Sequence, residues 1–450
     1  MKLSEIKEIY FLGIGGIGMS ALARYFLASG KTVSGYDKTP TPLTDELINE
    51  GAVIHFDDRP DLIPANVDLV ILTPAIPSSL NELHFVKSLE VPVLKRSEVL
   101  GEISKEKFTI AVAGTHGKTT ISSMIAHIFK CSNADFMAII GGIATNYNSN
   151  FIGNKNGEIL IVEADEFDRS FLTLYPDIAV ISSVDADHLD IYGTKDSVDR
   201  SFQLFADQIK ETGSLILKTG LAIEKENQLF TYSLNDGKNF KAISIKHQNE
   251  KFDVNFDLDG LMVNASVMYP GKHNIENALA ASAVAKLAQI PEKDIKDALE
   301  SYSGVKRRFE TIYQNDQIVY IDDYAHHPKE LSATIGAVKE MYPKKTLTGI
   351  FQPHLFTRTR DFADDFASSL EELDVVILME IYPAREEPIK GINSKFLLDK
   401  IDKSDTYLMS PNEIYNYLNE NTPECLLSLG AGNIDKLVEP IKAILSEKSY

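Results

Sequence analysis

A glycine-rich run in the middle of the chain has the residue types that bind phosphate groups. It comprises Gly114, Thr115, His116, Gly117, Lys118, Thr119 and Thr120. An apolar stretch, 110–113, precedes it, and apolar residues at helical spacing follow over 121–130. Glycines let backbone N–H groups approach phosphate oxygens, and a helix N-terminus adds partial positive charge. Lys118 would contact the β- and γ-phosphates and the Thr119 hydroxyl would coordinate Mg²⁺, so the run predicts a nucleoside-triphosphate loop.

The run departs from the strict phosphate-loop motif at one position. Val112 stands where the usual first glycine lies, five residues before Gly117, so only a shorter Gly-Thr-x-Gly-Lys-Thr form is matched. The alternative interpretation is a glycine-rich turn between a strand and a helix, with Lys118 at the surface.

A second glycine pattern lies near the start of the chain. Gly13, Gly15 and Gly18 follow an apolar strand candidate, and Asp37 ends the next one about 20 residues later. This is the fingerprint of a dinucleotide-binding βαβ unit, although it does not separate NAD from another nucleotide diphosphate. Thr73 follows the strand 68–72, where it either faces the ligand or satisfies the backbone of a turn.

Two buried strands in the middle of the chain end in acidic residues. The strand 158–164 ends in an acidic run that begins with Glu163, and the strand 178–184 is followed by an acidic run that contains His188. A carboxylate delivered beside a phosphate loop is the usual way to hold Mg²⁺. His188 either binds a second metal ion or pairs with a neighbouring carboxylate.

Polar residues farther along the chain are also candidates for ligand contact. Asn274 and Asn277 lie one helical turn apart and face the same way, as adenine contacts or as a cap and polar helix face. Strands over 318–321, 347–351, 375–379 and 425–429 all end in polar residues, which indicates a second open, mostly parallel sheet. The doublet His326-His327 lacks the spacing of a metal pair, which favours substrate contact.

These elements predict an α/β chain with three domains. A nucleotide-diphosphate domain is expected over 1–102, an ATP-binding domain over 103–304, and a second Rossmann-like domain over 305–450. Alternating polar and apolar residues over 228–268 predict antiparallel strands in a subsidiary sheet of the central domain.

The composition excludes several classes of function. The 450 residues carry a net charge of −20, which argues against general nucleic-acid binding and a basic membrane-surface patch. Cys131 and Cys425 have no metal or redox spacing, as expected in a reducing cytosol. No apolar stretch has the length of a membrane helix, so a cytoplasmic protein is expected, either monomer or homodimer.

Taken together and in this order, the motifs resemble the Mur ligase family, the ATP-dependent amino-acid ligases of peptidoglycan synthesis. The motifs are GTHGKTT, EADEFD, DADH, GKHNIEN, KRRFE, DDYAHHP and QPHLFTRTR, after the N-terminal glycine pattern. The glycine segment 13–20 is similar to that of the members that join L-alanine to UDP-N-acetylmuramate. The alternative within the family is the recycling ligase that attaches a tripeptide to the same nucleotide sugar.

The resemblance implies roles for residues at matching positions. Those expected at the UDP-sugar are Gly13, Gly15, Gly16, Gly18, Asp37 and Thr73. Those expected at ATP are the run 114–120 with His273, Asn274, Asn277, Arg308 and Asp323. Two magnesium ions are expected, and the residues expected to bind them are Thr119, Glu163 and His188. Those expected at the amino acid and the muramoyl carboxylate are Tyr324, His326, His354 and Arg358, with His326 or His354 as a base. The residues expected to take part in catalysis are Lys118, Glu163, His188, His326 and His354.

Two positions depart from the family pattern. Phe167 replaces a common serine, and Leu355 replaces a common arginine on the substrate side, for which Arg358 or Arg360 would compensate. The rival functions are a folate-type ligase, a nicotinamide oxidoreductase and a non-catalytic nucleotide switch. The oxidoreductase interpretation leaves the phosphate loop and the acidic strand ends unexplained.

Overall fold

The structure is a computed structural model that describes residues 3–154, 157–185, 192–226, 228–248, 251–269, 271–384 and 386–448. The described residues form two compact units. The first lies within Met1–Gln248, Phe252–Met268 and Asn274–Ser303, and the second within Asn249–Lys251, Tyr269–His273 and Gly304–Tyr450. Within the described ranges, no helix combines the length and the apolar character that crossing a membrane requires.

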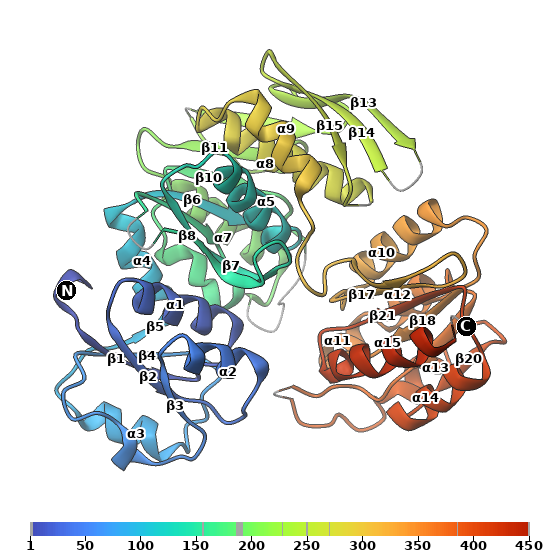
Figure 1. The fold of residues 1–450 in the computed structure, drawn as a ribbon, viewed down its shortest axis with the longest axis horizontal. Coiled ribbons are helices and arrows are strands. Elements are labelled where there is room, and N and C mark those ends of the chain that lie inside the picture. Colours follow the sequence, from blue (N-terminus) through green and yellow to red (C-terminus); the bar gives the residue numbers. More distant parts are fainter. Residues whose placement is uncertain are drawn as a thin grey trace. The chain divides into compact units, whose positions relative to one another are not determined.

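The first unit begins with a parallel five-stranded sheet of order β3-β2-β1-β4-β5, drawn in blue in Figure 1. Its strands are β1 (Glu8–Leu12), β2 (Thr32–Tyr36), β3 (Val53–His55), β4 (Leu69–Leu72) and β5 (Val93–Lys95). The helices between them are α1 (Ile17–Ala28), α2 (Pro42–Asn49), α3 (Asn81–Ser88) and α4 (Arg96–Glu106), with short 3₁₀ turns η1 (Leu3–Glu5) and η2 (Pro60–Leu62). This confirms the predicted parallel sheet, in which β1 and β2 end at the two parts of the glycine fingerprint.

A ten-stranded sheet follows in the same unit, in the order β15-β14-β13-β12-β11-β10-β6-β9-β7-β8. Its strands are β6 (Phe108–Ala113), β7 (Phe136–Ala144), β8 (Ser149–Gly153), β9 (Ile159–Glu163), β10 (Ile178–Ile181), β11 (Ser214–Lys218), β12 (Leu229–Ser233), β13 (Phe240–Gln248), β14 (Lys251–Leu258) and β15 (Leu261–Val267). Its helices are α5 (Lys118–Cys131), α7 (Lys195–Asp207), α8 (Lys272–Leu287) and α9 (Glu292–Ser301), with the 3₁₀ segment η3 (Phe167–Thr173). The central strands are mostly apolar, as is typical of parallel strands covered on both faces.

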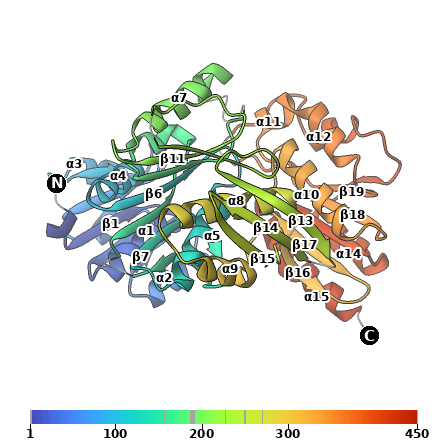
Figure 2. The same ribbon diagram turned by 90° about the horizontal axis from the view of Figure 1, so that it is seen from above.

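The region 228–268 is confirmed to contain antiparallel strands, since β14 pairs with β15 in antiparallel register from Phe252–Val267 to Leu258–Leu261. These strands extend the central sheet, and β12 joins it in parallel through β11 and β13. Figure 2 shows α9 beside β14 and β15. The extension has one polar face because its inward residues alternate with outward ones along each strand.

The second unit contains a six-stranded sheet of order β16-β17-β21-β18-β19-β20. Its strands are β16 (Glu310–Gln314), β17 (Val319–Asp323), β18 (Leu347–Phe351), β19 (Val375–Leu378), β20 (Thr406–Leu408) and β21 (Cys425–Leu429), all parallel except the edge strand β16. Its helices are α10 (Pro328–Met341), α11 (Phe356–Asp361), α12 (Ala363–Leu370), α13 (Ser394–Leu398), α14 (Pro411–Glu420) and α15 (Val438–Glu447), with the 3₁₀ segment η4 (Asn433–Leu437). The predicted open, mostly parallel sheet is confirmed.

A buried polar contact joins helix α1 of the N-terminal region to strand β8 of the ten-stranded sheet. Asn150 on β8 is fully buried; its amide donates to the Ile17 carbonyl (2.7 Å) and the Ser20 hydroxyl (2.8 Å), and its oxygen accepts from Arg24 (2.6 Å). Ile17 opens α1 and lies within the glycine fingerprint, between Gly16 and Gly18. Asn150 therefore fixes the start of α1 to the central domain.

Replacing Asn150 with alanine should destabilise the chain by about 1–3 kcal/mol, because it leaves buried polar partners without hydrogen bonds. Urea denaturation followed by circular dichroism measures this. The exposed Asn154→Ala, on the same hairpin, should change the unfolding free energy by less than about 0.5 kcal/mol. Equal effects of the two substitutions would contradict the role given to Asn150.

Candidate functional site

The predicted phosphate loop lies between the end of β6 and the start of α5. Gly114 and Gly117 both have backbone conformations that side chains rarely adopt, with φ of +140° and +84°. A Cβ atom at Gly114 would lie 2.2 Å from the Ser182 hydroxyl, and one at Gly117 would lie 2.8 Å from Asn277 Oδ1. Glycine is therefore required at both positions, by conformation and by space.

Residues after the neighbouring strand β10 hold this loop in place. The Ser183 hydroxyl accepts hydrogen bonds from the His116 backbone N–H (2.8 Å) and the Thr115 hydroxyl (3.0 Å), and Ser182 donates to the His116 carbonyl (2.5 Å). The His116 ring lies 3.2 Å from the Asp185 carboxylate. The loop is thus fixed through the His116 backbone and through the side chains of Thr115 and His116.

Lys118 is the first residue of α5, and its ammonium group is held inside the loop. Its Nζ lies 2.7 Å from the Gly114 carbonyl and 2.8 and 3.0 Å from the two carboxylate oxygens of Glu166. Burial lowers the pKa of Lys118, but nearby carboxylates, Glu166 first, outweigh burial and raise this pKa above its ordinary value. Burial also raises the pKa of Glu166, which is only 2% exposed. The raised pKa favours the charged form of Lys118 inside the glycine loop.

Thr119 and Glu163 meet at the ends of α5 and β9. The Thr119 hydroxyl donates to Glu163 Oε2 at 2.8 Å, and the Gly141 backbone N–H donates to the same oxygen at 3.0 Å. A hydroxyl and a carboxylate are oxygen ligands that suit Mg²⁺, which also takes ligands from nucleotide phosphates and water. Among the described residues, no group of three His, Cys, Asp or Glu side chains could hold a metal by itself. The residues therefore fit an ion that is completed by a nucleotide. His188 lies outside the described residues.

Asn277 and Asn274 of α8 lie on one helix face, as their spacing predicts. Asn277 Nδ2 donates to Asn274 Oδ1 at 3.2 Å, and Asn274 is buried. The contact of Asn277 with Gly117 puts this face beside the phosphate loop. His273 belongs to the second unit, and burial lowers its pKa to about 4.

The N-terminal glycine fingerprint forms a second loop in the same unit. Gly13 has φ +83°, and a Cβ atom there would lie 2.7 Å from Thr73, so the predicted Thr73 turn lies against this loop. The Gly15 backbone N–H donates to the Asp37 carboxylate at 2.8 Å. Gly16 precedes α1 as its N-terminal cap. The structure therefore brings the predicted residues of this site together.

Arg96 is a cation of this loop that the sequence interpretation missed. It is the first residue of α4, and a Cβ atom at Gly18 would lie 2.1 Å from its guanidinium. Its side chain is 25% exposed and lies 3.7 Å from Asp165. The sequence interpretation also did not identify Glu166, Ser182 and Ser183 as site residues. Arg96 follows a strand end, and that position is the one sequence signal that could have drawn attention to it.

Asp323 and its neighbours organise the end of β17 in the second unit. The Asp323 carboxylate accepts hydrogen bonds from the backbone N–H groups of Phe309 and Ala325, both at 2.7 Å, and burial raises its pKa to about 7. The Arg308 guanidinium lies 4.9 Å from the centre of the Tyr324 ring. Asp323 thus fixes two segments, one that carries Arg308 before β16 and one that begins with Tyr324 after β17.

The predicted histidines also lie together in the second unit. The His326 and His354 rings are 6.0 Å apart, and His354 stacks on Tyr382 at 5.7 Å. His326 Nδ1 lies 3.3 Å from Glu330, yet burial lowers the pKa of His326 to about 4. With this pKa, His326 is neutral at pH 7, and its ring is a weaker base than an unperturbed imidazole.

Leu355, which departs from the family pattern, lies in a strained backbone conformation. It has φ +71°, which is unusual for a residue with a branched side chain, and it is buried. Arg358, one turn along α11, is 8% exposed, whereas Arg360 is half exposed and pairs with Asp361 at 2.7 Å.

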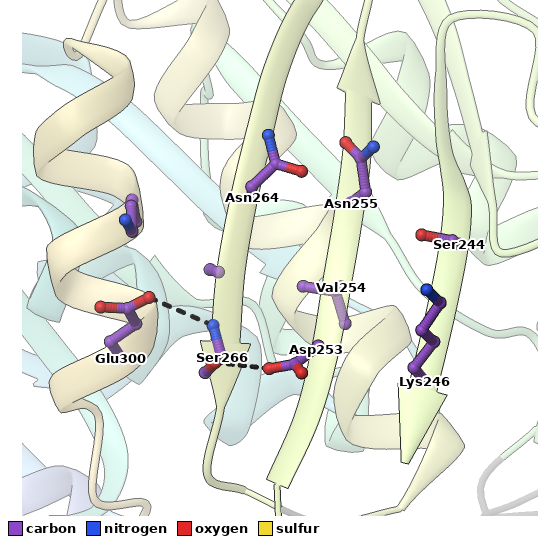
Figure 3. A pocket seen from close by; sticks show the side chains of 10 residues that line it. Ser244, Lys246, Asp253, Val254, Asn255, Asn264, Ser266 and Glu300 are labelled. Carbon is purple, nitrogen blue, oxygen red and sulfur yellow. Dashed lines mark hydrogen bonds between the residues drawn. The ribbon is translucent and has the colours of Figure 1, made fainter. Parts of the chain in front are cut away.

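A separate hollow lies over the polar face of β13–β15, beside α9 (Figure 3). In Figure 3, Asn255 and Asn264 lie side by side, and the Glu300 carboxylate reaches the Ser266 backbone N–H, a contact of 3.3 Å. Its lining carries two lysines and two acids, so their charges balance. The lining residues are Ser244, Lys246, Asp253, Val254, Asn255, Asn264, Ala265, Ser266, Lys296 and Glu300, and none is a predicted site residue.

Comparison with known families assigns all three parts of the chain. Residues 8–108 match the model described as "Mur ligase family, catalytic domain", residues 112–285 match "Mur ligase middle domain", and residues 307–428 match "Mur ligase, glutamate ligase domain". These matches follow the order of the three sheets.

Curated relatives are similar over the whole length. The chain is 49% identical to the UDP-N-acetylmuramate–L-alanine ligase of Flavobacterium psychrophilum, with all of both chains covered. It is 46% identical to the ligase of the same name from Parabacteroides distasonis, over 100% of this chain and 99% of the relative.

Solved structures agree with this assignment. A UDP-N-acetylmuramate–alanine ligase from Thermotoga maritima matches with a TM-score of 0.84 at 26% identity, covering 98% of this chain and 100% of that one. A murein peptide ligase from Psychrobacter arcticus shares the fold, with a TM-score of 0.71 at 24% identity and 98% of each chain covered. With three matching domains and full-length relatives at this identity, the chain belongs to the Mur ligase family.

Proposed function

We propose that the chain joins L-alanine to the lactyl carboxylate of UDP-N-acetylmuramate and converts ATP to ADP and phosphate, in the cytoplasmic part of peptidoglycan precursor synthesis. The observation that carries the proposal is a mostly enclosed cation, Lys118, held inside a glycine loop beside an acidic strand end. The full-length relatives at 43–49% identity are all named as ligases of this substrate pair, which favours L-alanine over a tripeptide.

Two steps follow from the residue types. The lactyl carboxylate attacks the γ-phosphorus of ATP, ADP leaves, and an acyl phosphate forms. The amine of L-alanine then attacks the acyl carbon, phosphate leaves, and the amine loses a proton. Lys118 balances the charge on the transferring oxygens. His326 or His354 is the proposed acceptor of the amine proton. Magnesium, when bound at Thr119 and Glu163, would neutralise phosphate charge.

The proposed binding residues follow the sequence prediction. We assign the UDP-sugar to the glycine loop of domain 1–102, with Asp37, Thr73 and, in addition, Arg96. We assign ATP to the loop 114–120 of domain 103–304, with Asn274 and Asn277 near the base. His273, Arg308 and Asp323 are assigned to ATP. Tyr324, His326, His354 and Arg358 of domain 305–450 are assigned to the amino acid and the muramoyl carboxylate. His188 keeps its assignment as a second magnesium ligand.

Phosphate release with each substrate omitted in turn tests the function. Release should require ATP, UDP-N-acetylmuramate and L-alanine together. Release with the L-alanyl-γ-D-glutamyl-diaminopimelate tripeptide in place of L-alanine would support the recycling ligase. Release that needs neither the nucleotide sugar nor an amino acid would rule out both.

Arg96→Ala should weaken binding of UDP-N-acetylmuramate by about 10-fold or more, the effect of losing one charge-assisted contact to a phosphate. Binding of ATP should not be weakened, since Arg96 lies at the other glycine loop. Calorimetry with each nucleotide separately measures both affinities. Arg200→Ala, an exposed arginine of α7, is the control and should change neither affinity. If Arg96→Ala weakened the binding of both nucleotides equally, the assignment of Arg96 to the UDP-sugar would be contradicted.

A further inference from the structure

A short acidic segment, Asp165–Asp168, lies between the two glycine loops of the first unit. On one side, both carboxylate oxygens of Glu166 contact the Lys118 ammonium, at 2.8 and 3.0 Å. Glu166 is buried, and the Tyr192 hydroxyl donates to its backbone carbonyl at 2.6 Å. A buried carboxylate needs a charge partner, so Glu166 and Lys118 hold each other in place.

The same segment reaches cations at the other loop. Asp168 Oδ2 lies 2.9 Å from Lys95 Nζ, and Asp165 Oδ2 lies 3.7 Å from Arg96 Nη2. Arg96 in turn lies against Gly18 of the N-terminal glycine loop. Three acidic residues of one short segment therefore pair with Lys118 at the phosphate loop, with Arg96 beside Gly18 and with the neighbouring Lys95.

The backbone that follows is strained, and its neighbours hold it. Asp168 and Arg169 have φ of +53° and +54°, two consecutive left-handed residues that are not glycine. Such conformations cost energy and persist only where the surroundings impose them. The Arg169 guanidinium lies 5.5 Å from the centre of the Tyr192 ring, and the Thr173 hydroxyl donates to the Ser97 carbonyl of α4 at 2.7 Å. The segment is thus tied both to α4 and to the core of the central sheet.

We propose that Asp165, Glu166 and Asp168 are positioning residues that couple the two nucleotide sites. The proposal rests on the proposed function, because it takes ATP phosphates as the ligand of Lys118 and the nucleotide-sugar diphosphate as the ligand of Arg96. A phosphate that reaches either cation replaces the carboxylate there. The strained segment then loses one of its ion pairs. Fewer contacts hold the remaining carboxylates on their cations, so the second nucleotide displaces them more easily. Each nucleotide therefore strengthens binding of the other, by the same factor.

Binding of the β,γ-imido analogue of ATP, measured by calorimetry with and without saturating UDP-N-acetylmuramate, tests the coupling. In the wild-type chain, the nucleotide sugar should lower the Kd of the analogue by about 5-fold or more, within the usual range of such coupling. The double variant Asp165→Asn, Asp168→Asn lacks the anchors at Lys95 and Arg96. It should bind the analogue alone more tightly than the wild type does, and the nucleotide sugar should add little.

The control is Glu102→Gln, which removes a partly exposed carboxylate of α4 that pairs with Lys105, and it should keep the wild-type coupling. If the role of the segment were purely structural, the double variant would instead bind the ATP analogue more weakly than the wild type does. That result, or coupling that persists in the double variant, would overturn the inference. A wild-type chain that turns over all three substrates without coupling would also overturn it and would leave the proposed function intact. A chain that binds no UDP-N-acetylmuramate would defeat both.

Discussion

Lys118→Ala should lower kcat/KM for ATP by about 10³-fold or more, the size of effect that a cation stabilising a transferring phosphoryl group provides. The expectation follows from position: Nζ lies 2.7 Å from the Gly114 carbonyl, inside the loop that would hold the phosphates. Binding of UDP-N-acetylmuramate should be nearly unchanged, because its proposed loop follows a different strand. Steady-state phosphate release and calorimetry measure the two quantities.

The same substitution also removes the partner of a buried acid, and this effect must be separated from catalysis. Breaking the Lys118–Glu166 pair should destabilise the chain by about 3–5 kcal/mol, because Glu166 keeps a buried carboxylate without its cation. The double variant Lys118→Ala, Glu166→Gln should regain much of this stability in urea denaturation, yet stay inactive. Lys130→Ala, at the exposed end of α5, should affect neither quantity. Activity in the double variant would contradict the role of Lys118.

The sequence predicted the two glycine loops because their function depends on local backbone chemistry. Gly114 and Gly117 need their conformations wherever the rest of the chain lies, and Lys118 and Thr119 follow them in the chain. The strands were also predictable, since parallel strands covered on both faces are continuous apolar runs in the sequence. Their ends therefore gave the positions of Asp37, Thr73 and Glu163 correctly within the fold.

The residues that hold these loops were not predictable from spacing. Ser182 and Ser183 reach the phosphate loop only because β10 pairs beside β6, and no local pattern specifies that neighbour. Arg96 meets Gly18, and Glu166 meets Lys118, across sequence distances of 78 and 48 residues. Such contacts depend on sheet order and helix packing, which many sequences with the same local pattern would satisfy differently.

Glu163→Gln should lower kcat/KM by about 10²-fold and raise the Mg²⁺ concentration needed for half-maximal activity. A metal ion contributes several kcal/mol of charge stabilisation to phosphoryl transfer, and each 1.4 kcal/mol is about tenfold in rate. Glutamine has nearly the same shape and keeps an oxygen that can accept from Thr119 and Gly141, so the fold should be retained. The amide is nevertheless a weaker ligand for a hard cation than the carboxylate is. Titration of activity with Mg²⁺ at saturating ATP measures the shift.

The matched control is Glu158→Gln, which removes an exposed carboxylate at the opposite end of the same strand, β9, and should leave the Mg²⁺ requirement unchanged. The comparison is informative because parallel strands β6 and β9 bring Val112 opposite Glu163, so only one end of β9 meets the phosphate loop. If Glu163→Gln lowered the rate without changing the Mg²⁺ requirement, Glu163 would be holding Thr119 and Gly141 rather than binding the ion. The metal would then have to be held by other groups.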